Sequence, residues 1–176
     1  MRTEVSQEVV DKLLSITKNI LGEHGVELIL NKVNSKREEG FDGKELVFMI
    51  GKEIQNIYGK NGGFAVFRQI GREVAKSLME EKSSDEWEKI FLIALKFLGF
   101  AEEIQKFEEE ACICNCIFFP NFLEPMNIKP IEHPVCWGGL GLIEGFVREL
   151  DRGVRGVRWK ERDFQKNRCV FSFERS

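Results

Sequence analysis

Apolar residues change their spacing part-way along the chain, and this change restricts the folds that the sequence can adopt. Across residues 10–98 they recur every three or four positions, as on one face of an amphipathic helix. Residues 102–119 end in the alternation of a strand, and residues 154–164 and 169–174 read as two further strands joined in a hairpin. Helices followed by antiparallel strands are typical of α+β proteins. We therefore predict one α+β domain over residues 1–176, with N-terminal helices packed on a small antiparallel sheet.

Glycines divide the helical region into shorter helices. Gly22 and Gly59 follow apolar periodic stretches and are expected to end helices there. Residues 60–63, Lys-Asn-Gly-Gly, are expected to form a turn and the start of the next helix. The last of these helices, residues 84–98, carries apolar side chains nearly all round, so we expect it to occupy a central position.

A proline-rich segment separates the helices from the last part of the chain. Four prolines fall within fifteen residues, at Pro120, Pro125, Pro130 and Pro134, which predicts a long irregular connection. A helix is expected over residues 138–150, with small residues along one stripe. Such a stripe allows close packing, either on the sheet or on a second copy of the chain.

Composition limits the classes of partner. The chain has 26 basic and 29 acidic residues and a net charge of −3, which argues against direct nucleic-acid binding. The N-terminus is polar, and no apolar run approaches the ~20 residues of a membrane span, so we expect a cytoplasmic protein without membrane contact. Fifteen phenylalanines but one tyrosine provide aromatic surface that is almost purely apolar, as a core or an apolar cavity requires.

Five cysteines favour free thiols or a metal over a disulfide framework. Cys112, Cys114 and Cys116 alternate along a predicted strand, so their thiols would lie about 6.5–7 Å apart on one face. Zinc, with Zn–S distances of ~2.3 Å, needs sulfurs much closer together. We interpret these three cysteines as small buried side chains on the core face of the sheet.

Cys136 and Cys169 differ because each lies at the boundary of a predicted element. Glu161, Asp163 and His133 lie near enough in sequence to complete a mixed metal site, although no Cys-x-x-Cys spacing is present. Structural thiols are the favoured interpretation from spacing alone. A nucleophilic Cys136 with His133 as its base is the alternative, but no third residue that would orient the base is evident.

The glycines of residues 139–145 form a loose version of a dinucleotide-binding fingerprint, and Glu161 follows Gly141 by twenty residues. The strand that should precede such a fingerprint is missing, and too little chain remains for a βαβ unit. We interpret these glycines as packing positions, and we predict no catalytic residues.

In the order and spacing of several short motifs, the chain resembles the 4-vinyl reductase (hydrocarbon-binding) domain family, over residues 9–174. The motifs are Tyr58-Gly59 with Gly63, then Arg68-Gln-Ile-Gly71-Arg72, then Cys136 with Gly141 and Gly145, and finally Cys169-Val-Phe-Ser-Phe. The family's fold is similar to that of the transport-protein-particle subunits of vesicle-tethering complexes. The resemblance implies a homodimeric α+β domain with an apolar pocket between its helices and its sheet.

The resemblance also implies a function, the binding of small hydrophobic or aromatic molecules, sometimes as the sensor part of a transcription regulator. Our candidates for the pocket lining are Phe67, Phe91, Phe97 and Trp137, with the alternative that all four fill the core. A reductase-like enzyme of tetrapyrrole or aromatic metabolism is a competing function. An interaction subunit of a regulator protein is another. Saturable binding of NAD, NADP or FAD would favour the enzyme, and co-purification with a regulator would favour the interaction subunit.

Phenol-sensing members of this family carry zinc on one cysteine, a Glu-x-x-Cys pair and a final cysteine. The first and last of these map onto Cys136 and Cys169, whereas the middle cysteine falls on Glu161 and the glutamate on Arg158. The glycine that usually lies between the last two cysteines falls on Gln165.

The resemblance therefore implies a possible structural zinc held by Cys136, Cys169 and Glu161. One of the three cysteines on the predicted strand, at positions 112, 114 and 116, would complete the set.

Overall fold

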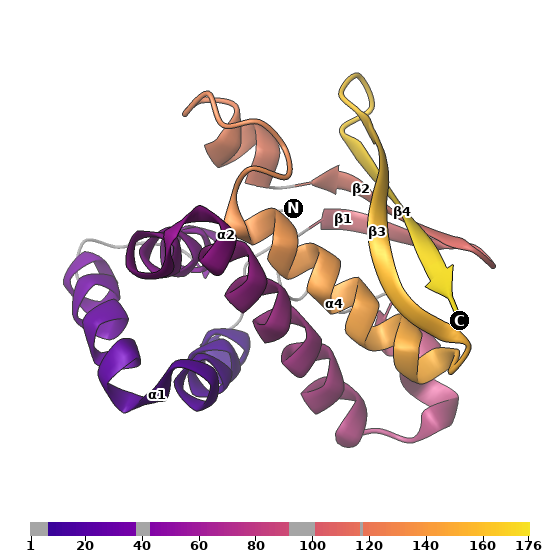
Figure 1. Cartoon of the computed structure of the whole chain (residues 1–176), viewed down its shortest axis with the longest axis horizontal. Helices are drawn as coiled ribbons and strands as arrows, with labels where there is room; N and C mark the ends of the chain where they lie inside the picture. The colour runs from indigo at the N-terminus through magenta and orange to yellow at the C-terminus, as the bar shows by residue number, and fades with distance from the viewer. Residues whose placement is uncertain (1–6, 38–42, 92–100, 117) are drawn as a thin grey trace.

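The first half of the chain is helical, and the second half contains the four strands and one further long helix (Figure 1). The structure, a computed structural model, describes residues 7–37, 43–91, 101–116 and 118–176, and the statements below concern these residues. In chain order the elements are α1 (Gln7–Arg37), α2 (Gly43–Glu80), the short 3-10 helix η1 (Ser84–Glu86), β1 (Ala101–Lys106), β2 (Glu110–Cys116), the π-helical turn η2 (Phe119–Leu123), α4 (Pro134–Leu150), β3 (Val154–Asp163) and β4 (Arg168–Arg175). The predicted α+β class is confirmed.

Both long helices change direction at a glycine, as Figure 1 shows for α1 and α2. Gly22 has φ 78° and Gly59 has φ 76°, in the left-handed region that glycine tolerates best. The predicted helix breaks are therefore confirmed as kinks. The predicted turn at residues 60–63 is wrong, because the helix resumes directly after Gly59. Gly63 packs against the preceding half of α2, where a Cβ would lie 2.9 Å from the Cα of Gln55.

The glycines of α4 allow this helix to approach α2 closely. A Cβ on Gly141 would lie 2.0 Å from the carbonyl oxygen of Arg68, and one on Gly145 would lie 2.7 Å from the Cβ of Ala75. Gly71 of α2 makes the reciprocal contact with the backbone of α4. The small-residue stripe thus packs on a helix of the same chain, and not on the sheet or on a second copy as predicted.

The four strands form one antiparallel sheet in the order β1-β2-β4-β3. The core face of β4 carries Cys169, Phe171 and Phe173, which join the main apolar cluster with Ala111 and Ile113 of β2. The sequence indicated one strand over residues 102–119. Instead, β1 and β2 are separated by a hairpin turn without glycine or proline, closed by Phe107 N–H donating to Glu110 O at 2.8 Å.

Two predictions concern residues near the gap at positions 92–100. Of the helix expected over residues 84–98, the structure describes η1 and one helical turn at residues 87–91. The remainder, with Phe97, lies outside the described residues.

Among the helices that are described, none has both the length and the apolar content to cross a membrane.

Candidate functional site

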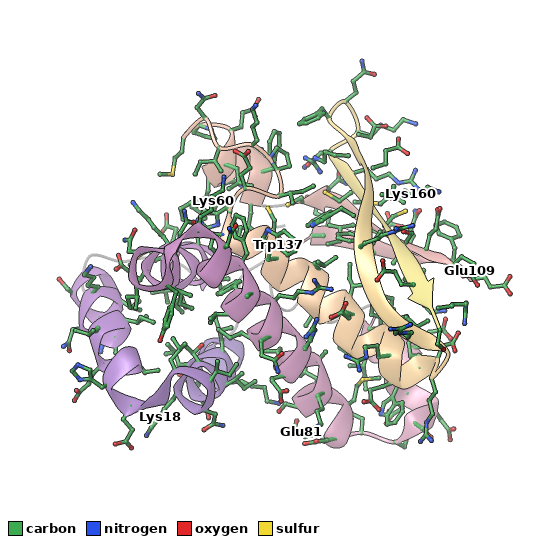
Figure 2. All side chains as sticks on the ribbon, viewed as in Figure 1. Lys18, Lys60, Glu81, Glu109, Trp137 and Lys160 are labelled. Atoms are coloured by element: carbon green, nitrogen blue, oxygen red, sulfur yellow. The ribbon has the colours of Figure 1, made fainter. Side chains whose placement is uncertain are left out.

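An open hollow lies between the second half of α2 and the N-terminal end of α4, where Figure 2 shows Trp137. Its volume is about 370 Å³. The lining residues are Asn61, Phe64, Ala65, Arg68 and Arg72 of α2 with Trp137 of α4. Phe64, Arg68 and Arg72 follow one another at intervals of four positions, with Asn61 and Ala65 beside them, so helical geometry places the five along one stripe that faces the start of α4.

Two aromatic rings form one wall of the hollow. The rings of Phe64 and Trp137 are stacked, with centroids 5.3 Å apart and planes inclined by 18°. Trp137 Nε1 donates to the carbonyl oxygen of Ile131 at 2.8 Å, which fixes the orientation of the indole. Both side chains are half-buried, so each keeps part of its ring exposed.

A buried carboxylate holds the two arginines of the hollow. Glu144 of α4 is 1% exposed and accepts hydrogen bonds from Arg68 Nη2 at 2.6 Å, from Arg72 Nε and from Val157 N at 2.9 Å. Burial raises the pKa of Glu144, but the hydrogen bonds from Arg68 and Val157 and the charges of both arginines outweigh it, so the pKa lies below its usual value. Glu144 is therefore ionised at neutral pH, and the three side chains carry a net charge of +1.

These bonds leave part of each guanidinium for other partners. Arg68 Nη2 also donates to Val157 O at 3.2 Å, and Arg72 Nη1 donates to Gln69 Oε1 at 3.3 Å. None of these hydrogen bonds uses Arg68 Nη1 or Arg72 Nη2. The side chains of Arg68 and Arg72 are 28% and 32% exposed, so the hollow combines aromatic surface with accessible cationic donors.

Two further hollows are lined by Arg72, one of them also by Arg68, and both are lined by carboxylates as well. One, toward β3, is lined by Arg68, Arg72, Glu144, Arg155, Gly156, Glu174 and Arg175. The other, toward the C-terminal end of α4, includes Glu73 and Glu149 among its lining residues. Neither is lined by an aromatic ring, and so the hollow beside Trp137 is the strongest candidate for a binding site.

Of the four predicted lining residues, Trp137 borders this open hollow. Phe67 is buried and borders a void of only about 20 Å³ between α1, α2 and α4. Phe91 is buried with its ring edge-to-face on Phe146 at 5.4 Å. Phe67 and Phe91 therefore occupy core positions, and Phe97 lies outside the described residues.

Sequence reasoning missed Phe64, Arg68 and Arg72. Arg68 and Arg72 entered only through a motif of the resemblance and not as lining residues, and the helical spacing of the three residues was the available signal.

Cys136 and Cys169 are neutral thiols. Burial raises the pKa of Cys136 to about 12 and that of Cys169 to about 11. Cys116 lies close enough to both for its charge to contribute to these shifts. Cys169 Sγ also accepts a hydrogen bond from Arg162 Nη1 at 3.1 Å. Cys136, Cys169 and Cys116 thus lie near enough to influence one another electrostatically, but within the described residues they do not form a group that could hold a metal ion.

Glu161 does not join these cysteines. It is exposed and pairs with Val170, whereas Cys169 pairs with Arg162, and neighbouring strand residues point to opposite faces. The cause is a bulge between Trp159 and Glu161, which reverses the alternation that would have put Glu161 on the side of Cys169. Within the described ranges, no three His, Cys, Asp or Glu residues form a group that could hold a metal ion, so the ligand set that the resemblance implies for zinc is not assembled.

The three cysteines of β2 do not share one face. Cys112 and Cys114 lie on the side of Val170 and Arg168, and Cys112 Sγ accepts from Arg168 Nη2 at 3.0 Å. Asn115, within β2, has φ 55°, which disturbs the regular alternation of side chains, and Cys116 packs against the main core instead. The prediction that all three face the core is therefore wrong.

His133 has a structural role at the start of α4. Its Nδ1 accepts the N–H of Val135 at 3.1 Å, and its ring stacks on Phe48 with centroids 4.3 Å apart. Burial, with a smaller contribution from the charge of Lys52, lowers the pKa of His133 to about 4. Because Nδ1 is occupied in capping the helix, the arrangement gives no support to His133 as a base for Cys136.

The fold and the site together define an α+β domain whose α2–α4 pair carries an open hollow of aromatic and arginine side chains. Comparison with protein families, curated proteins and solved structures finds no match to this chain.

Proposed function

We propose that this chain is a binding domain for small aromatic molecules and that the ligand lies in the hollow beside Trp137. The observation that carries the proposal is the half-buried stack of Phe64 and Trp137 along an open hollow of about 370 Å³. Ligand sites in proteins typically have volumes of about 300–1,000 Å³ and are lined by aromatic side chains with a few polar groups.

The geometry favours a planar ring as the ligand. A ring placed against the Phe64–Trp137 pair extends an existing aromatic stack, and each aromatic contact contributes about 0.5–1.5 kcal/mol beyond the area that it buries. The hydrogen bond from Trp137 Nε1 to Ile131 O holds the indole in place before the ligand arrives. Little side-chain entropy is therefore lost on binding.

Replacing Trp137 tests this function. Trp137→Ala removes one wall of the hollow, so saturable binding of naphthalene-ring probes should weaken by about tenfold or more, as expected for the loss of an aromatic contact of ~1.4 kcal/mol. Thermal shift and fluorescence titration measure the effect. Trp159→Phe is the matched control, because Trp159 packs on Phe171 of the sheet, away from the hollow.

Two results would reject the proposal. One is the absence of saturable stabilisation by any aromatic probe. The other is saturable binding of NAD, NADP or FAD that survives Trp137→Ala, which would favour the reductase-like alternative.

We also propose that the protein is a homodimer, with a second copy seated on an apolar patch formed by Leu28, Ile57 and Tyr58. These side chains are 49%, 42% and 41% exposed. The ion pair of Lys32 with Glu53 joins α1 to α2 at 2.8 Å. Leu28 lies one turn before Lys32 and Ile57 one turn after Glu53, so antiparallel packing places them side by side. A two-fold axis lets one such patch cover itself.

A further inference from the structure

We infer that the hollow beside Trp137 takes an aromatic monoanion, a planar ring system that carries one carboxylate. The inference rests on the proposed function and specifies its ligand class. The observation behind it is that Arg68 and Arg72 adjoin the stacked rings of Phe64 and Trp137 in a hollow that is lined by no carboxylate among the residues that the structure describes.

The net charge of the site matches a ligand that carries one negative charge. Arg68 and Arg72 are the charged residues among those that line the hollow. Glu144, 1% exposed behind them, offsets one of their two positive charges. The remaining charge of +1 lies next to the aromatic wall, and a single carboxylate neutralises it. A multiply charged ligand would bring negative charge that nothing in the lining balances.

The hydrogen bonds of the arginines point to a carboxylate as well. Glu144 and Gln69 bind Arg68 Nη2, Arg72 Nε and Arg72 Nη1, and these bonds leave Arg68 Nη1 and Arg72 Nη2 unused. Hydrogen bonds between guanidinium and carboxylate are charge-assisted and about twice as strong as neutral ones. Since Glu144 already fixes both arginines, binding a carboxylate costs little further ordering.

The spacing along α2 sets the size of the ligand. Arg68 follows Phe64 by four residues, which corresponds to a rise of about 6 Å along a helix. A carboxylate attached directly to a ring, or through one carbon, reaches the guanidinium while the ring lies on the aromatic wall.

On the side toward β3, no further net positive charge for a ligand lies beyond Arg72. In the adjoining hollow, Glu174 contributes a negative charge, and Arg175 is already bound to Glu109 and Asp151. Arg155 also lines this hollow, so the charges beyond Arg72 have both signs, and an extended anionic tail would gain no net positive charge there.

Matched probes test the inference. 2-Naphthoate and its neutral analogue 2-naphthalenemethanol share the ring and differ in charge. Calorimetric titration of the wild type at pH 7 should give at least about tenfold tighter binding of naphthoate, because hydrogen bonds to charged groups are the stronger ones. The preference should shrink as salt concentration rises, since Arg68 and Arg72 are partly exposed.

Ala65→Glu is the decisive variant. Ala65 is exposed in the lining, so a carboxylate there leaves the buried ion cluster intact while cancelling its positive charge. In Ala65→Glu the preference for naphthoate over the alcohol should disappear. In Ala65→Gln, which adds a side chain of the same size without the charge, any loss of affinity should be equal for the two probes and the preference should persist. Naphthoate preference that persists in Ala65→Glu, or equal binding of both probes to the wild type, overturns the inference and leaves the proposed function standing. Failure of both probes to bind the wild type rejects the proposed function itself.

Discussion

His133 couples the stability of the protein to pH through a single side chain. Its pKa lies near 4 in the folded chain, below the ordinary value of 6.5, because the ring is buried between the start of α4 and Phe48. Above pH 6.5 the ring is neutral in both states and adds no pH dependence. As pH falls toward 4, the unfolded chain takes up a proton that the folded chain excludes, so stability is lost at roughly 1.4 kcal/mol per pH unit.

The variant His133→Asn should therefore flatten this part of the pH profile. Asparagine can still cap α4 through its side-chain oxygen, but it does not titrate. Between pH 6.5 and pH 5 the free energy of unfolding of the wild type should fall by about 2 kcal/mol more than that of the variant. Urea unfolding at the two pH values measures the difference. If the free energy of unfolding fell equally in the two proteins, the pH dependence could not be due to His133.

Between elements, the crossing of α2 and α4 is a close approach of two backbones, and it positions the candidate site. Gly141 meets the backbone of Arg68, one of the two arginines of the hollow. Because the obstacle is backbone, no side-chain rotation can relieve an added Cβ. The helices must separate, and the ion cluster of Arg68, Arg72 and Glu144 spans the same crossing.

Gly141→Ala should thus destabilise the fold by about 3 kcal/mol, at the upper end of the usual cost of overpacking. It should also weaken ligand binding, because Arg68 is displaced. Gly51→Ala is the control, since its added Cβ would make ordinary contact at 3.4 Å with Pro134 and gain helix propensity. Chemical denaturation measures both variants. Equal stability of the two would show that the crossing is not limited by backbone contact.

Over the whole molecule, α2 connects two surfaces with different proposed roles. The half before Gly59 packs on α1 (Figure 1) and contributes Ile57 and Tyr58 to the patch that Leu28 of α1 completes. The half after Gly59 lines the hollow. A single kinked helix therefore links the proposed dimer interface to the proposed ligand site.

The proposed dimer can be tested through a single exposed residue of the patch. Ile57→Glu places a charge in the patch, so it should convert a dimer of about twice 20.4 kDa into a monomer at micromolar concentration. Sedimentation velocity measures the change. Phe107→Glu is the matched control, because Phe107 is 50% exposed on a different part of the surface. A wild type that sediments as a monomer at these concentrations would reject the dimer.

The sequence by itself determined the local features of the fold. The helical spacing of the first half, the breaks at Gly22 and Gly59, and the strands that became β3 and β4 were all predicted, because each depends on residues close together in the chain. The α+β class follows from their order. Trp137 was one of the four lining candidates that accompanied the resemblance, and it lines the hollow.

Only the tertiary structure decided which distant residues meet. Arg68 and Arg72 resemble solvated charges until α4 brings the buried Glu144 against them. The glycines of α4 gave no sign of their partner, because small residues fit equally well on a sheet, a helix or a second chain. A one-residue bulge in β3 placed Glu161 on the opposite face from Cys169. Such contacts depend on register and on packing between segments far apart in sequence, which local patterns do not encode.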